Sequence, residues 1–254
     1  MKYFFLITLG IVFFVCNSFS DEIKKLPYCP DQSVWKHAAY KGESQSHIVN
    51  IETAIDLGYC GIELDIIYDE DEEIIYISHD RINSVEKKKY YSLDRIDKVF
   101  KDSKIYIWLD WKNTNFFNLV KGSDSIQKSM KKYLSKEGSI IFIETPNVIH
   151  NEILNILIRD NGNIFVLNWL SFIQETNRFK EKIKNIFRFS RAWLYVCVLP
   201  DRWVSTPNVE ILNLCKNKQK VKSIFVFTVN KLEKAKTIFS MGADVILTDQ
   251  LLQN

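Results

Sequence analysis

Short apolar runs of strand character alternate with longer stretches of helical period along most of this chain. The runs are residues 34–39, 61–68, 104–112, 139–145, 163–169, 192–199, 223–229 and 244–248. Amphipathic helices are indicated between them, for example at 48–57, 147–159 and 232–241. Strands that alternate with helices are joined in parallel by right-handed crossovers. Eight such units predict a (β/α)8 TIM barrel. An open doubly wound sheet is the alternative, although no Gly-rich phosphate loop follows a run.

Length and composition agree with one barrel domain over residues 21–254. The chain has 254 residues, close to the size of about 250 that is typical of a TIM barrel. A hydrophobic content of 46% excludes wholesale disorder. The net charge of +3 comes from 34 basic and 31 acidic residues, a balance too even to indicate a nucleic-acid partner. Nothing in the sequence indicates a partner protein.

The first twenty residues predict a secretory signal peptide. Met1 and Lys2 give a positive start, residues 3–15 are apolar and uncharged, and small residues precede a cut after Ser20. The protein is therefore expected to be exported, either secreted or periplasmic. An uncleaved anchor and a buried N-terminal helix are the alternatives, but the run is short for a span of about 20 residues. A lipid anchor on Cys16 is disfavoured because Val15 is bulky.

Four cysteines remain after residue 20, namely Cys29, Cys60, Cys197 and Cys215. In an exported chain they can form two disulfides, with three pairings available. Four buried free thiols are the alternative. Neither the cysteine spacing nor the four histidines of the chain suit a zinc site.

Two of the predicted strands carry acidic residues on one face. Alternation along a strand places Glu63 and Asp65 on one side of residues 61–68, and Asp110 and Lys112 on one side of residues 104–112. The opposite faces are apolar and suit contact with helices, so the polar pairs are expected to point into the barrel. Both pairs lie near the C-terminal ends of their strands, where barrel enzymes build their active sites.

Three inward carboxylates repel one another strongly unless a cation holds them or a proton neutralises them. Oxygen-only ligands favour Mg²⁺ or Ca²⁺. We therefore expect Glu63, Asp65 and Asp110 to bind one divalent cation. The alternative is that these acids form buried ion pairs with Lys112 and nearby Arg residues.

Two histidines are expected on the same rim. His37 ends the first run, and His79 ends an extra extended run at residues 74–78. Such a pair can act as general base and general acid on a phosphate held by the cation. A structural hydrogen-bonding role is the alternative for each. His47 and His150 are interpreted as surface residues.

These motifs resemble the glycerophosphodiester phosphodiesterase family, within the phospholipase-C-like phosphodiesterase barrels. The family has a His at the end of strand one, then a Gly-x-Glu-x-Asp strand and a His-Asp pair. The chain matches with His37, the strand that begins at Gly61, and His79–Asp80. Asp110 and Lys112 are similar to its third-strand acid and Lys. Residues 228–230, 242–244 and 248–249 resemble its closing Thr-Val-Asn, Gly and Thr-Asp segments.

The resemblance implies a TIM barrel in which Glu63, Asp65 and Asp110 bind the metal, His37 and His79 transfer protons, and Lys112 holds a phosphate oxygen. The chain departs from the family at three places. Ala38 and Ala39 follow the first His where Arg and Gly are usual, and Asp110 replaces a Glu. The segment at 81–91 is too short for the subdomain that many members insert there. These differences concern the substrate more than the reaction class.

The function expected from the resemblance is metal-dependent cleavage of small glycerophosphodiesters or phospholipid headgroups, with transient contact to a membrane surface. Two alternatives stay open. One is a catalytically inactive barrel that acts as a binding protein, because the usual Arg is missing. The other is a phospholipase-D-type lyase, in which a hydroxyl of the substrate attacks and a cyclic phosphate is released.

Overall fold

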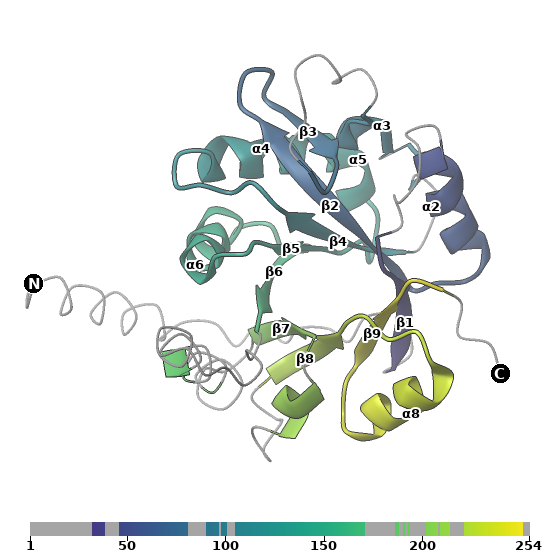
Figure 1. The fold of residues 1–254 in the computed structure, drawn as a ribbon. Coiled ribbons are helices and arrows are strands. Elements are labelled where there is room, and N and C mark those ends of the chain that lie inside the picture. Colours follow the sequence, from purple (N-terminus) through teal and green to yellow (C-terminus); the bar gives the residue numbers. More distant parts are fainter. Residues whose placement is uncertain are drawn as a thin grey trace, which may run out of the picture.

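Eight parallel strands close into a barrel in the computed structural model of the protein (Figure 1). The structure describes residues 32–38, 46–80, 90–96, 98–100, 105–170, 186–187, 190, 193, 202–207, 209–213 and 221–250. The barrel strands are β1 Ser33–Lys36, β2 Gly61–Asp69, β4 Tyr106–Trp111, β5 Ile141–Glu144, β6 Ile164–Trp169, β7 Arg202–Thr206, β8 Val221–Val226 and β9 Val245–Thr248. β1 pairs with both β9 and β2, which closes the ring. The predicted TIM barrel is confirmed.

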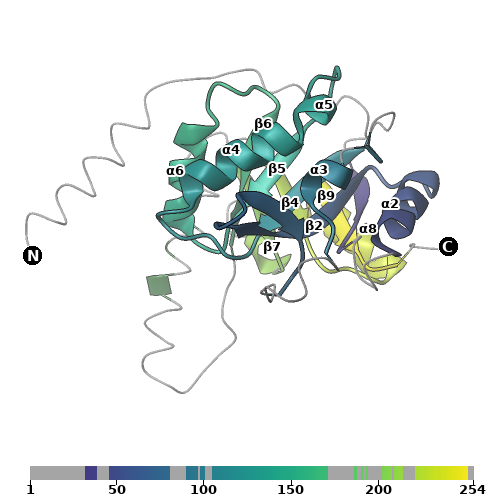
Figure 2. The ribbon, with the colours of Figure 1, turned by 90° about the horizontal axis from the view of Figure 1, so that it is seen from above.

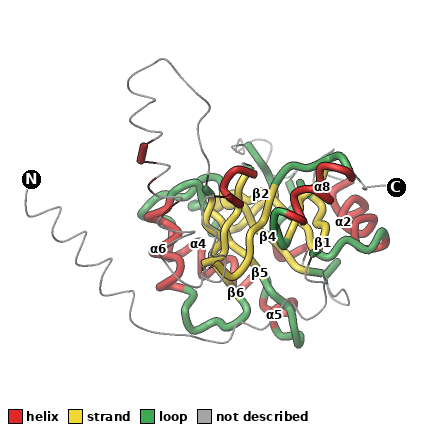
Figure 3. The backbone as a smooth tube through the Cα atoms, turned by 90° about the horizontal axis from the view of Figure 1, so that it is seen from below, coloured by secondary structure: helices red, strands yellow, loops and turns green. Residues whose placement is uncertain are grey.

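Helices surround the strands, as the tube in Figure 3 and the view in Figure 2 show. They are α2 Ser46–Asp56, α3 Leu93–Ile96, α4 Leu119–Ser129, α5 Lys131–Leu134, α6 Val148–Leu157 and α8 Leu232–Ser240, with a 3-10 turn at Val209–Asn213. The side chain of Asn147 caps α6 by accepting from the Ile149 N–H. Among the described residues, no helix is both long and apolar enough to cross a membrane.

One barrel strand was not predicted. The expected strand at residues 192–199 lies outside the described residues, apart from Trp193. The place between β6 and β8 is taken by β7, Arg202–Thr206. β7 has only five residues, and Arg202, Ser205 and Thr206 make its sequence polar. It lacks the apolar run by which the other strands were recognised.

The two faces of the strands pack in different environments. Ile62, Leu64 and Ile66 of β2 belong to the layer between the barrel and its helices, together with Ile51 of α2. The barrel interior holds a second, mostly aromatic cluster, composed of Trp35, Tyr106, Trp108, Ile140, Phe142, Leu167, Trp203, Phe225, Val245 and Leu247. The predicted orientation of β2, with its aliphatic residues toward the helices, is confirmed.

A hairpin extends β2 and brings the chain back to the barrel. β3, Ile74–Ile77, is antiparallel to β2, and its last residue pairs with Ile66. The turn is held by Asp69, whose Oδ1 accepts from the N–H groups of Asp71 and Glu72. The N–H of Ser78 then donates to the Asp65 carbonyl at 3.0 Å. The residues after β3 therefore lie beside the C-terminal half of β2.

Candidate functional site

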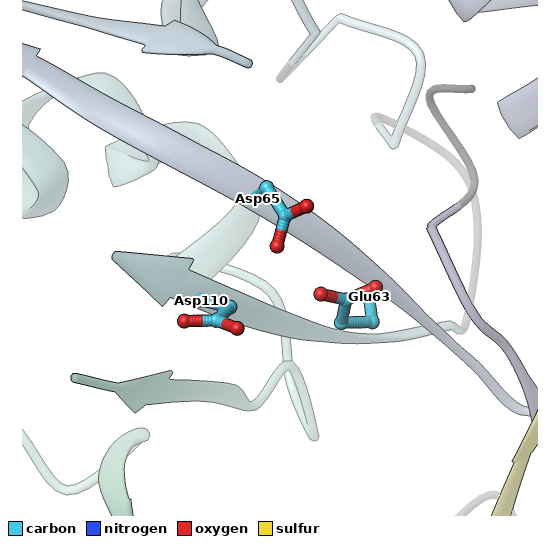
Figure 4. A group of neighbouring side chains, drawn as sticks. All are labelled: Glu63, Asp65 and Asp110. Carbon is cyan, nitrogen blue, oxygen red and sulfur yellow. The ribbon is translucent and has the colours of Figure 1, made fainter. Parts of the chain in front are cut away.

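The three predicted acids converge where β4 ends beside the middle of β2. Asp65 and Asp110 are register partners on these adjacent strands, and Glu63 lies two residues before Asp65 on the same face. One carboxylate oxygen from each lies within 4.8 Å of the others. Figure 4 shows the three side chains projecting from the two strands toward a common region. The parity argument therefore placed all three acids correctly.

Lys112 lies among these acids. Its Nζ is 2.7 Å from Asp65 Oδ1 and 2.5 Å from Asp110 Oδ2. Burial alone lowers the pKa of Lys112, but Asp110 and Asp65 outweigh it and raise the pKa above its ordinary value. The ion pairs of the alternative interpretation are thus present for two of the three acids.

Glu63 takes no part in these ion pairs. It is buried, and its Oε2 accepts from the Ala38 N–H at 2.6 Å. Burial, followed by repulsion from Asp65 and Asp110, raises the pKa of Glu63 well above its ordinary range. Burial also raises the pKa of Asp110, although Lys112 counteracts it. Three carboxylates in a largely buried cluster with one Lys are a donor set that fits a hard divalent cation.

His37 is fixed by residues from the end of the chain. Its Nδ1 lies 2.7 Å from Asp249 Oδ1, and its Nε2 lies 3.9 Å from Glu63 Oε2. Asn230 in turn donates to Asp249 Oδ2 at 2.9 Å and accepts from the Asp249 N–H at 2.8 Å. Sequence reasoning did not identify this role of Asp249, although it had noted the Thr-Asp and Thr-Val-Asn segments.

His79 lies on the same side of the barrel but is more open to solvent. Its side chain is 64% exposed, and its Nδ1 is 3.0 Å from Asp80 Oδ1. His79 is near enough to lower the pKa of Asp110 electrostatically. Both predicted histidines therefore flank the acids, with His37 held firmly and His79 at the solvent edge.

A fourth interior acid was missed. Glu144 ends β5 as the register partner of Asp110, and its Oε2 accepts from Ser205 Oγ at 2.5 Å. Burial, followed by Asp110, raises the pKa of Glu144 well above its ordinary range. The signal in the sequence was a single acid at the C-terminal end of an apolar run. Glu144 lies two residues after Phe142, so both side chains point to the same side of β5, which is the barrel interior.

Two other predictions concern the remaining histidines. His150 is not a plain surface residue, because it is partly buried and its Nδ1 lies 3.0 Å from Thr114 Oγ1 in the loop after β4. His47 lies in α2, and its side chain is outside the described part of the chain. Ala38 has the left-handed φ of 45°, and this conformation accompanies the contact of its N–H with Glu63.

Comparisons with solved structures show the same barrel. A phosphodiesterase from Oleispira antarctica, solved with its product sn-glycerol-3-phosphate, is 14% identical over 85% of this chain and 92% of that chain, with a TM-score of 0.60. A glycerophosphodiester phosphodiesterase from Thermotoga maritima is 17% identical over 87% and 96%, with a TM-score of 0.50. A calcium-dependent phosphoinositol-specific phospholipase C from a Pseudomonas species is 9% identical over 85% and 88%, with a TM-score of 0.51.

Sequence comparison adds nothing to this likeness, because no family model and no curated protein sequence matches the chain. At such low identities the structural likeness establishes the fold. The chain therefore shares the barrel of solved glycerophosphodiester phosphodiesterases, the family that its motifs resemble.

Proposed function

We propose that the protein is a metal-dependent phosphodiesterase that cleaves small glycerophosphodiesters or phospholipid headgroups. One observation carries the proposal: Glu63, Asp65 and Asp110 converge at the C-terminal end of the barrel, with His37 and His79 on either side. Paired imidazoles beside an acid cluster provide a base and an acid for phosphodiester cleavage. The shared fold of the solved phosphodiesterases supports the same class of reaction.

Glu63, Asp65 and Asp110 would hold one Mg²⁺ or Ca²⁺. The bound cation would supply positive charge that stabilises the charge on the phosphate oxygens in the transition state. Lys112 would add a second positive charge for a phosphate oxygen, which requires its ammonium group to exchange contacts with Asp65 or Asp110. The carboxylates released in this exchange then become available to the cation.

The two histidines would divide the proton transfers. Asp249 accepts from Nδ1–H of His37, which leaves Nε2 with a free lone pair directed toward the acid cluster. In this tautomer His37 takes the proton of the attacking hydroxyl, and His79 gives a proton to the departing alcohol. Water as the attacking group gives hydrolysis, and a hydroxyl of the substrate gives a cyclic phosphate.

The proposal is tested by a screen of phosphodiesters with and without added Mg²⁺ or Ca²⁺, followed by His37→Ala and His79→Ala on the best substrate. Each change is expected to lower turnover by about 10²–10⁴-fold, the usual contribution of a general acid or base. Lys112→Ala is expected to weaken substrate binding as well as the rate. His150→Ala is the matched control and should keep parental turnover. Parental turnover in both His37 and His79 variants would favour the inactive-barrel alternative.

Export through a signal peptide at residues 1–20 is part of the proposal, although these residues lie outside the described part of the chain. Support comes from Cys60, which is disulfide-bonded. Structural disulfides persist in oxidising compartments outside the cytosol. The other cysteines lie outside the described residues. N-terminal sequencing of protein from its native host should give a start at residue 21, and a start at Met1 would contradict cleavage.

We also propose transient contact with a membrane surface. Phe116 and Phe117 follow β4 in the loop after Lys112, and they are 68% and 88% exposed. Exposed aromatic rings on a rim insert favourably at a lipid interface. Their position beside the site would suit a substrate held in a lipid layer.

A further inference from the structure

Exposed apolar side chains continue from the loop after β4 onto the first turns of two helices. Phe116 and Phe117 are 68% and 88% exposed, Val120 in α4 is 52% exposed, and Ile149 in α6 is 62% exposed. α4 and α6 lie side by side (Figure 1), and an imidazole of α6 lies 3.0 Å from a threonine hydroxyl of the loop. These four residues, called the rim patch below, therefore lie together at the end of the barrel that carries the site.

An acidic turn borders the rim patch. Residues 69–73, between β2 and β3, are five acids in succession. Glu70 Oε1 accepts from the side-chain amides of Asn115 and Asn118 at 3.0 and 3.1 Å. Neutral amides hold this carboxylate beside the aromatic loop without cancelling its charge. The last acid of the turn pairs with Lys121 at 2.6 Å.

A phospholipid surface suits an apolar patch in this place. The patch lies on the rim of the site, and aromatic rings insert at a lipid interface without needing a surface of matching shape. The acidic turn then selects the kind of lipid. The outermost charge of a zwitterionic headgroup such as phosphocholine is its ammonium group, which attracts carboxylates. Anionic headgroups repel them over a Debye length of about 8–10 Å.

We propose that the rim patch docks on zwitterionic phospholipid and that the acidic turn, residues 69–73, disfavours anionic lipid. The proposal deepens the membrane contact proposed above and rests on that part of the proposed function. It extends the contact from two rings to four side chains on three elements. It also assigns a role to the acidic turn, which the cleavage reaction does not use.

The test is co-sedimentation of the mature protein with vesicles in chelator, so that no cation bridges the acids to lipid phosphates. The parent should bind phosphatidylcholine vesicles about tenfold more tightly than vesicles with about 30% phosphatidylglycerol, since each charge near a lipid surface changes binding by about fivefold. Asp71→Lys should reduce this difference by about 5–25-fold. Asp160→Lys makes the same charge change on an exposed acid between α6 and β6, at the opposite end of the barrel, and should keep the parental difference.

The apolar part of the patch is tested in the same assay. Val120→Ser combined with Ile149→Ser should weaken binding to phosphatidylcholine by about 3–10-fold, because both side chains leave water in the docked state. Leu57→Ser combined with Ile156→Ser is the control, since these residues are 51% and 60% exposed near the C-terminal ends of their helices. The control should bind like the parent.

Equal or tighter binding of the parent to the anionic vesicles, or no binding to either kind, would overturn the proposal. A parent that binds as expected but cleaves no phosphodiester refutes the phosphodiesterase function and keeps the docking surface. A parent that cleaves soluble diesters without binding vesicles refutes the docking surface alone. Thermal melting identifies any variant that fails to fold, and Asp71→Asn, with half the charge change, then takes the place of Asp71→Lys.

Discussion

Asp249 reaches His37 from the opposite end of the chain. The two residues are 212 positions apart, yet their Oδ1 and Nδ1 atoms lie 2.7 Å apart because β9 pairs with β1. Asn230 holds the other oxygen of Asp249. The carboxylate therefore fixes both the ring orientation of His37 and its tautomer.

We expect Asp249→Asn to lower kcat by about 10–100-fold, as when partners that orient ligands at metal sites are removed. The amide can present N–H to Nδ1 and so favour the wrong tautomer. The pH–rate profile should change shape as well, which a purely structural role would not produce. A profile and kcat equal to the parent's would exclude a positioning role. Asp80→Asn tests the corresponding contact of the exposed His79.

Gly61 opens the strand that carries Glu63 and Asp65 because nothing larger fits there. A Cβ at this position would lie 2.2 Å from the Trp35 ring, which fills the barrel interior. Gly61→Ala should therefore destabilise the fold by about 1–3 kcal/mol or more, which is about 2–12 °C in Tm for a domain of this size. Gly162→Ala is the matched control, since no atom lies within 4 Å of its added Cβ. Equal melting temperatures for the two variants would contradict this account.

At the residue scale, the sequence predicted the parts of the site that come in pairs. Residues two positions apart on a strand point to the same side of the sheet. This spacing placed Glu63 beside Asp65 and Asp110 beside Lys112. Glu144 is a lone acid at the end of a run, and Asp249 acts through a contact that only barrel closure creates. Alternation along one strand does not reveal contacts between distant strands.

At the scale of elements, the antiparallel pairing of β3 with β2 decides where His79 lies. An extended run after β2 was evident from the sequence, but its antiparallel pairing was not. The pairing brings Ser78 to the level of Asp65 and so places His79 beside the acids rather than beyond the hairpin. β7 was missed because three of its five residues are polar, so no apolar run marks it, and its pairing with β6 and β8 appears only in the structure.

The loop between β4 and α4 holds its aromatic residues in a fixed position. Asn115 Oδ1 accepts from the N–H groups of Phe117 and Asn118, and the Asn115 and Asn118 amides donate to Glu70 Oε1 in the β2–β3 turn. The rings of Phe116 and Phe117 pack edge to face, with their centroids 6.2 Å apart. A loop tied down in this way keeps two apolar rings exposed, at a cost that contact with a lipid surface would remove.

We expect the double change Phe116→Ser and Phe117→Ser to lower the rate on a phospholipid presented in vesicles by about tenfold or more, since each ring removes apolar area from water. The rate on a water-soluble glycerophosphodiester should stay at the parental level. Ile156→Ser changes an exposed apolar residue on α6 and is the control. Equal losses on both substrates would show that the rings serve the site itself rather than a membrane surface.

At the scale of the whole molecule, the acid cluster links stability to pH and to the cation. The pKa of Glu63 is raised above its ordinary 4.5 in the folded protein. The folded state therefore binds more protons than the unfolded state above that pH, and the metal-free protein should lose stability as pH rises from about 4.5 toward the raised pKa. Glu144 acts in the same direction. A cation that neutralises the ionised acids removes this loss.

Thermal melting in chelator, and with Mg²⁺ or Ca²⁺, tests this linkage. At pH 8, a cation at 100 times its Kd should raise Tm by about 5–10 °C, since such an excess stabilises by about 2.7 kcal/mol. At pH 4.5 the gain should largely disappear, because protons compete for the same carboxylates.

Glu63→Gln removes the ionisable group, so in chelator at pH 8 it should melt above the parent and gain little from the cation. Glu52→Gln, a change at an exposed acid on α2, should follow the parent at both pH values. A cation effect that is equal at the two pH values, or that survives in Glu63→Gln, would place the cation elsewhere than on these three acids.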